Sequence, residues 1–89
     1  VEIINASGIS GQAQKLRDYL QKYKDIDVKI ISKTKQNNLE NTIIIDRKAN
    51  IRSAQRLKEI LRVGQIKREV KPNYLWDITI IIGKDLKGI

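Results

Sequence analysis

The chain of 89 residues contains no cysteine, histidine, methionine or phenylalanine. Without cysteine and histidine it has no thiol nucleophile, no disulfide and no imidazole base, and it lacks the usual protein ligands of zinc, copper and haem iron. Carboxylates alone could hold a metal ion. We therefore expect neither a cofactor nor a metal, and we do not expect an enzyme.

Long apolar runs are also missing. The longest, Ile43 to Ile45 and Ile78 to Ile82, are far shorter than the roughly 20 residues that cross a bilayer. The sequence contains no signal peptide, and it begins inside an apolar run at Val1. We interpret residues 1–89 as a single domain excised from a longer protein, because this length leaves room for one core.

Charge of one sign dominates the chain. It has 18 Lys and Arg against 10 Asp and Glu, which gives a net charge of +8. Such a charge attracts nucleic acid, acidic lipid surfaces or phosphate-bearing wall polymers. The alternative is that the charge only keeps a small isoleucine-rich domain in solution.

Apolar, β-branched runs predict five strands. They cover Val1–Ile4, Val28–Ser32, Thr42–Asp46, Ile66–Lys71 and Ile78–Ile82. The fourth strand alternates apolar and charged residues, which suits an exposed edge. The fifth is almost wholly apolar and suits the centre of a sheet. Pro72 and Asn73 form a turn that would join these two strands as a hairpin.

Helical spacing of apolar residues predicts two helices. The first carries its apolar face on Ile9, Ala13, Leu16, Leu20 and Tyr23, and the second on Ile51, Ala54, Leu57 and Leu61. Asn50 is the expected N-cap of the second helix, and Gly64 is expected to end it in the left-handed conformation.

This order of elements predicts an α+β fold. We expect a ferredoxin-like split βαβ two-layer sandwich, with two helices packed on one face of a four- or five-stranded, mainly antiparallel sheet. The competing interpretation is a sheet with parallel strands and helices on both faces. Isoleucines on both faces of the third and fifth strands keep that alternative open.

The turn between the first strand and the first helix is the first candidate site. Its residues Asn5, Ser7, Gly8, Ser10 and Gly11 could bind an anion or a saccharide through free N–H groups at the helix start. The structural interpretation, in which a serine caps the helix and Gly11 allows close packing, is favoured because such turns are common. Gly8 to Gly11 also has the G-x-x-G form of nucleic-acid-binding KH domains.

A set of basic residues on and after the second helix is the second candidate site. It comprises Arg52, Arg56, Arg62, Lys67, Arg68 and Lys71. As a patch it would bind wall polymer, acidic lipid or nucleic acid. Because no aromatic residues lie among them, we favour a solvated face without a partner.

Two smaller groups of residues have both a functional and a structural explanation. Tyr74 and Trp76 could stack on a sugar ring if exposed, or cover the edge of the core if buried. Asp46, Asp77 and Asp85 could assemble a metal or acid-base site, but each stands at the end of a strand, where Asp is an ordinary turn residue.

The order of these motifs resembles the LytR C-terminal domain family. The family's glycine-rich pattern after its first strand corresponds to Asn5-Ala6-Ser7-Gly8-Ile9-Ser10-Gly11-Gln12-Ala13. Later landmarks correspond to Thr42, Ala54, Leu57, Asp77, Thr79, Gly83 and Asp85. The chain departs from the family at Ala6, where a glycine is usual, and at residues 47–50, which lack the usual Pro-Gly.

The resemblance implies a non-catalytic accessory domain of a bacterial cell-envelope protein of the LytR type, which attaches glycopolymers to the cell wall. It implies a place outside the membrane, in a parent protein that is membrane-anchored. The expected partners are anionic wall polymer, peptidoglycan or the catalytic domain of the same chain. The alternatives are a nucleic-acid-binding module and a structural domain that docks on its catalytic neighbour.

Overall fold

A computed structural model of the chain describes residues 1–31 and 38–87. Along the described residues the elements are β1 (Glu2–Asn5), α1 (Gln12–Leu20), β2 (Lys29–Ile31), β3 (Ile43–Asp46), α2 (Ile51–Leu61), β4 (Gln65–Arg68) and β5 (Ile78–Ile82). The structure therefore confirms an α+β fold with the predicted strands and helices in the predicted order. The fourth strand ends at Arg68 and not at Lys71, and Ile9, predicted on the apolar face of the first helix, precedes α1 and is exposed. Ser32, the last residue of the second predicted strand, lies outside the described residues.

The strands form one mixed sheet in the order β2-β1-β5-β3-β4. β1 runs parallel to both β2 and β5, β3 runs parallel to β4, and β3 and β5 are antiparallel. Three of the four pairings are thus parallel, and the prediction of a mainly antiparallel sheet is wrong. β5 lies at the centre and β4 at an edge, as predicted.

The same pairings show that two further predictions, the split βαβ arrangement and the hairpin between the last two strands, are wrong. In a split βαβ unit another strand lies between the two joined by the helix, whereas here β1 pairs directly with β2 and β3 with β4. The helix crossovers α1 and α2 allow this because they can join neighbouring parallel strands. β5, which is buried on both faces, pairs with β1 and β3 instead of forming a hairpin with β4.

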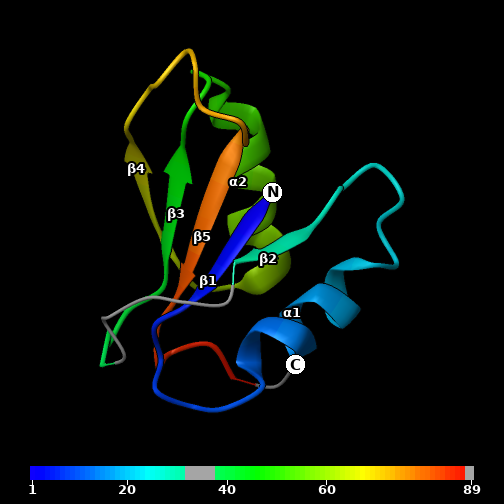
Figure 1. The fold of residues 1–89 in the computed structure, drawn as a ribbon, viewed down its shortest axis with the longest axis vertical. Coiled ribbons are helices and arrows are strands. Elements are labelled where there is room, and N and C mark those ends of the chain that lie inside the picture. The colour runs from blue at the N-terminus through cyan, green and yellow to red at the C-terminus, as the bar shows by residue number, and fades with distance from the viewer. Residues whose placement is uncertain (32–37, 88–89) are drawn as a thin grey trace.

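Both helices lie on one face of the sheet. Ile3, Ile80 and Ile44 stand side by side in register on that face, and they are fully buried. They share one core cluster with apolar residues of α1 and α2. Figure 1 shows α2 behind β5. Right-handed crossovers place both helices on the same side, because the two βαβ units run antiparallel at opposite ends of the sheet.

The second face of the sheet carries no helix among the described residues. Glu2, Thr79 and Ile45 form a buried row across its centre. The connection from β4 to β5 reaches this row, since Tyr74 Oη donates to the Glu2 carboxylate at 2.8 and 3.0 Å. A neighbouring row that includes Ile4 and Ile81 is half-buried.

The two ends of α2 test two sequence predictions. Asn50 is the N-cap, as predicted, and its Oδ1 accepts from Ser53 N. Gly64 does not end the helix: Arg62 takes the left-handed conformation there, with φ +63°. Gly64, two residues later, has φ +122°, which residues with a Cβ rarely adopt, and a Cβ there would lie 2.8 Å from Ile44 Cδ1.

Candidate functional site

The turn between β1 and α1 is held by hydrogen bonds among its own residues. Asn5 Oδ1 accepts from Ser7 N at 3.1 Å and from Ser7 Oγ at 2.6 Å, while Asn5 Nδ2 donates to Ile9 O at 2.9 Å. Ser7 Oγ accepts from Ile9 N at 3.0 Å, and Ser7 is 1% exposed. The two polar side chains best placed to hold a ligand are therefore occupied within the turn itself.

Neither serine of the turn caps α1. Its N-cap is Gly11, which has φ +83° and no side-chain hydrogen bond to the helix. Gly8 also has a positive φ, of +78°. Ser10 is exposed. Both glycines are thus explained by backbone conformations that residues with a Cβ rarely adopt.

Ala6 shows why one departure from the family pattern is harmless. It is fully buried, and its φ is not positive. The second departure, the absence of the Pro-Gly at residues 47–50, leaves an alanine in a strained backbone conformation. Ala49, in the segment that lacks the Pro-Gly, has φ +57°, a conformation that suits glycine better than alanine.

The predicted basic residues lie around one edge of the domain and point to both sides of the sheet. Arg52 and Arg56 lie one turn apart on the side of α2 opposite its buried residues, and Arg62 follows the end of the helix. By strand alternation, Lys67 lies beside Ile45 on the face without helices, while Arg68 lies beside Asp46 on the helix side. These residues surround one edge of the domain, and Lys71 follows in the connection.

Arg56 already has a partner. Its guanidinium makes a bidentate ion pair with the carboxylate of Asp25, which lies in the segment between α1 and β2. The hydrogen bonds from Arg56 lower the pKa of Asp25, and the same bonds raise the pKa of Arg56. Both groups are exposed to solvent, so the pair contributes little to stability.

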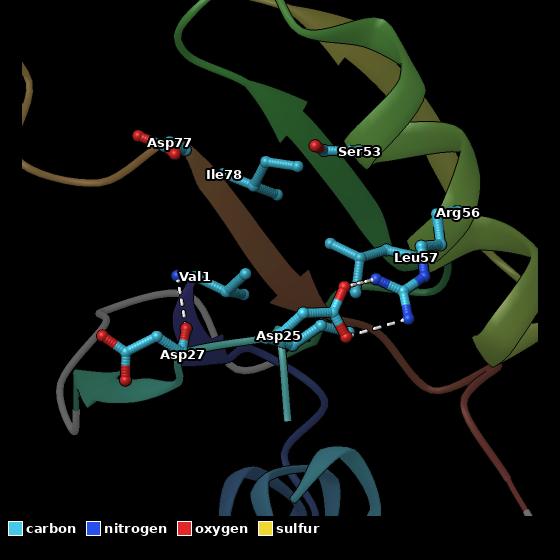
Figure 2. Close-up of a pocket in the computed structure, with 9 residues that line it drawn as sticks. Val1, Asp25, Asp27, Ser53, Arg56, Leu57, Asp77 and Ile78 are labelled. Carbon is cyan, nitrogen blue, oxygen red and sulfur yellow. Dashed lines mark hydrogen bonds and ion pairs between the residues drawn. The ribbon is translucent and has the colours of Figure 1, made fainter. Parts of the chain in front are cut away.

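A cavity of about 210 Å³ lies beside this ion pair, between α2 and the first residues of β1 and β5. Its lining includes Ser53, Asp27 and Asp77. Figure 2 shows the carboxylates of Asp25, Asp27 and Asp77 pointing in different directions. The cavity is smaller than most ligand pockets, which have volumes of roughly 300 Å³ or more. The carboxylates that line it do not converge on a single point.

A cluster of hydrogen bonds joins the start of β3 to the end of β5. Asp85 Oδ1 accepts from Thr42 N at 2.9 Å and from Thr42 Oγ1 at 2.6 Å, and Thr42 Oγ1 accepts from Gly83 N at 3.0 Å. A Cβ on Gly83 would lie 2.5 Å from the carbonyl carbon of Asn41. The backbones approach so closely that a larger residue does not fit.

The fold separates Asp85 from the other two candidate metal-binding aspartates, Asp46 and Asp77, which lie at the same end of the sheet. Asp46 is fully buried, and its Oδ1 accepts from Lys48 N and Asn50 N where β3 meets α2. Asp85 accepts a hydrogen bond from Thr42 N at the opposite end of β3. Among residues 1–31 and 38–87 there is no group of carboxylates able to hold a metal ion. Asp46 and Asp85 act as turn residues.

One polar cluster was not predicted from the sequence. Glu2 is only 4% exposed although it is charged, and its carboxylate accepts from Tyr74 Oη. The guanidinium of Arg47 lies 4.6 Å from the centre of the Tyr74 ring, and Arg47 Nε donates to Thr79 Oγ1 at 3.2 Å. The available signal was a single glutamate in an otherwise apolar strand, without any indication of its distant partner.

Comparison with known proteins matches residues 1–86 to a family described as LytR cell envelope-related transcriptional attenuator. The chain belongs to the LytR C-terminal domain family. Domains of this family are non-catalytic accessory parts of LytR-type cell-envelope proteins. No curated protein and no solved structure matches the chain.

Some of the residues that resemble the family pattern, Asn5 to Ala13 with Thr42, Gly83 and Asp85, lie at one end of this LytR C-terminal domain, whereas Asp77 precedes β5 at the opposite end. Leu39 N donates to Ala6 O, which ties the first turn to the segment before β3. Lys84 N donates to Leu39 O, and Gln12 Nε2 donates to Leu86 O. This part of the pattern therefore has a structural explanation, as a hydrogen-bonded end that joins four segments. In the part of the chain that the structure describes, neither helix is long and apolar enough to cross a membrane.

Proposed function

We propose that this domain is a binding module that holds anionic wall polymer, or the peptidoglycan that carries it, outside the membrane of a membrane-anchored parent protein. The observation that carries the proposal is the distribution of charge. Residues 51–71 contain seven Lys and Arg and two Glu, so this stretch holds +5 of the chain's net charge of +8. It forms α2 and β4, which pack against each other.

The polymer lies along the exposed side of α2 and the edge formed by β4. Arg52, Arg62, Lys67 and Arg68 have no carboxylate within ion-pair distance among the described residues. Arg56 joins them only in part, because Asp25 occupies its guanidinium. The turn between β1 and α1 is not included, since Asn5 and Ser7 use their polar atoms inside the turn.

The test measures binding to soluble poly(glycerol phosphate) at several salt concentrations. Charge reversal of Arg52, Arg62 and Lys67 to Glu should abolish binding at moderate salt. At salt concentrations low enough for the variant still to bind, its slope of log affinity against log salt should be smaller than that of the wild type by about two to three. Each lost phosphate contact removes about one released counterion.

The matched control reverses three exposed lysines elsewhere, Lys15, Lys24 and Lys87, and changes the net charge equally. Retained binding in this control supports a defined face. Equal loss in both variants overturns the proposal, because it leaves only general attraction by net charge. Tighter binding to an oligonucleotide of matched charge than to wall polymer or peptidoglycan fragments would favour the nucleic-acid alternative.

A further inference from the structure

The connection from β4 to β5 presents one strongly exposed apolar side chain. This connection forms the extreme end of the molecule in Figure 1, where it is drawn in yellow and orange. Leu75 is 80% exposed, and Val70 in the same connection is 45% exposed. Tyr74 and Trp76, on either side of Leu75, are half-buried. Leu75 therefore projects from between two half-buried aromatic residues, of which Tyr74 is bonded to Glu2.

This connection is braced against the junction of β3 and α2. Lys71 N donates to Arg47 O and Arg47 N donates to Asp77 O, each at 2.9 Å. Lys48 Nζ donates to Pro72 O at 2.7 Å, and Tyr74 is fixed by its bond to Glu2. Leu75 is thus presented on a loop with a defined shape, which reduces the entropy cost of placing it in a new environment.

Cations surround this end of the domain. Lys48, Arg68 and Lys71 lie within or beside the connection, and Arg52 lies in the first turn of α2, which starts at the same end. The acidic residues of the connection are Glu69 and Asp77. Two further carboxylates at this end, Glu2 and Asp46, are buried, so positive charge is in excess on the exposed surface around Leu75.

We propose that this end of the domain docks on an anionic lipid bilayer, with Leu75 inserted below the headgroups and Trp76 at the level of the interface. Trp and Tyr favour that level, and basic side chains are attracted to acidic headgroups. A soluble polyanion gains nothing from Leu75. A protein partner would need a broad apolar patch, whereas this end offers one projecting side chain framed by cations. The proposal goes beyond polymer binding because it requires apolar insertion.

Trp76 is the sole tryptophan of the chain and reports its own environment. We expect its emission to shift to the blue on vesicles of phosphatidylglycerol and phosphatidylcholine, but not on phosphatidylcholine alone. Brominated lipids should quench it. Leu75→Glu should weaken partitioning by about tenfold or more, equivalent to about 1.4 kcal/mol.

The matched control is Ile9→Glu, which makes the same charge change at an exposed isoleucine in the turn between β1 and α1, at the opposite end of the domain. It should partition like the wild type apart from a small loss due to charge. Vesicle binding without a blue shift or quenching would overturn the proposal. So would equal loss in the Leu75 and Ile9 variants.

The two proposals fail separately. A wild-type chain that inserts into vesicles but does not bind soluble poly(glycerol phosphate) contradicts polymer binding alone. A Leu75→Glu variant that still binds the soluble polymer as tightly as Ile9→Glu, while losing vesicle insertion, supports both proposals.

Discussion

Thr42 and Asp85 stand 43 residues apart in the sequence and share two hydrogen bonds, from the backbone N and the hydroxyl of Thr42 to one carboxylate oxygen. Thr42 is fully buried. Asp85→Ala leaves both donors without this acceptor, and we expect a loss of about 1–3 kcal/mol in the free energy of unfolding. Urea denaturation followed by circular dichroism measures it.

Asp85→Asn keeps a carbonyl acceptor and should lose less stability than the alanine variant. Asp18→Ala is the surface control, since Asp18 is exposed and its nearest ion pair, with Arg17, is 3.6 Å long. It should change the midpoint little. If the Asp18 and Asp85 variants were equally stable, the bonds to Thr42 would be unimportant.

Gly83→Ala tests the close approach of β5 and the start of β3. The new Cβ would lie 2.5 to 2.9 Å from backbone atoms of Asn41 and Thr42. These atoms belong to the main chain and cannot rotate away, so we expect a loss of about 3 kcal/mol. Gly11→Ala meets no atom within 4 Å and suffers only from its positive φ, so it should lose about 1–2 kcal/mol. The reverse ranking would contradict this explanation.

Ala49→Gly should stabilise the domain. Ala49 has φ +57°, and glycine adopts this conformation without steric cost. We expect a gain of about 0.5–1 kcal/mol in thermal or urea unfolding. Ala13→Gly, inside α1, is the control and should lower the free energy of unfolding, because glycine in a helix costs about 1 kcal/mol. A destabilised Ala49→Gly variant would show that the turn does not carry this strain.

The phenol of Tyr74 should make stability depend on alkaline pH. Burial raises the pKa of Tyr74 above its usual 10.0, and the hydrogen bond to Glu2 acts in the same direction. The unfolded chain therefore ionises this phenol first. The corresponding stability is complete below pH 10.0 and is lost as the pH rises from there through the folded pKa.

Unfolding free energies measured from neutral to alkaline pH, in the wild type and in Tyr74→Phe, isolate this group. The extra decline above pH 10.0 should be absent from the variant. A parallel decline in both proteins would assign it to other groups.

Asp25→Asn should strengthen binding to a soluble polyanion. The substitution removes one negative charge and releases the guanidinium of Arg56 on the exposed side of α2. Asp18→Asn makes the same change of net charge on α1 and is the control. Titrations at low salt should show the larger gain for Asp25→Asn. Equal gains would mean that Arg56 plays no part in binding.

Local signals in the sequence predicted the elements well, because each depends on its own residues. The Thr42–Asp46 run, the Asn50 cap and the central position of β5 follow from β-branched side chains, an Asx cap and an apolar strand. The strand order did not follow. Two helix crossovers permit split or direct pairing with the same local pattern, so β5 could not be placed between β1 and β3 in advance.

The candidate sites show the same division. Glycine spacing identified the Asn5–Gly11 turn, but the inward direction of the Asn5 and Ser7 side chains depends on backbone geometry. Composition identified the basic residues, while the pairing of Arg56 with Asp25, 31 residues earlier, is a tertiary contact. Glu2 and Tyr74 are 72 residues apart, and nothing near either residue indicates the other.

The central position of β5 has a consequence for how the domain forms during synthesis. β5 is the last of the described strands to be synthesised, and it pairs with both β1 and β3. Until it emerges, the two βαβ units have no common strand, and the nascent chain exposes the edges of both. Assembly is therefore a late, all-or-none event, and a chain truncated before Ile78 should yield two unjoined halves that are prone to aggregation.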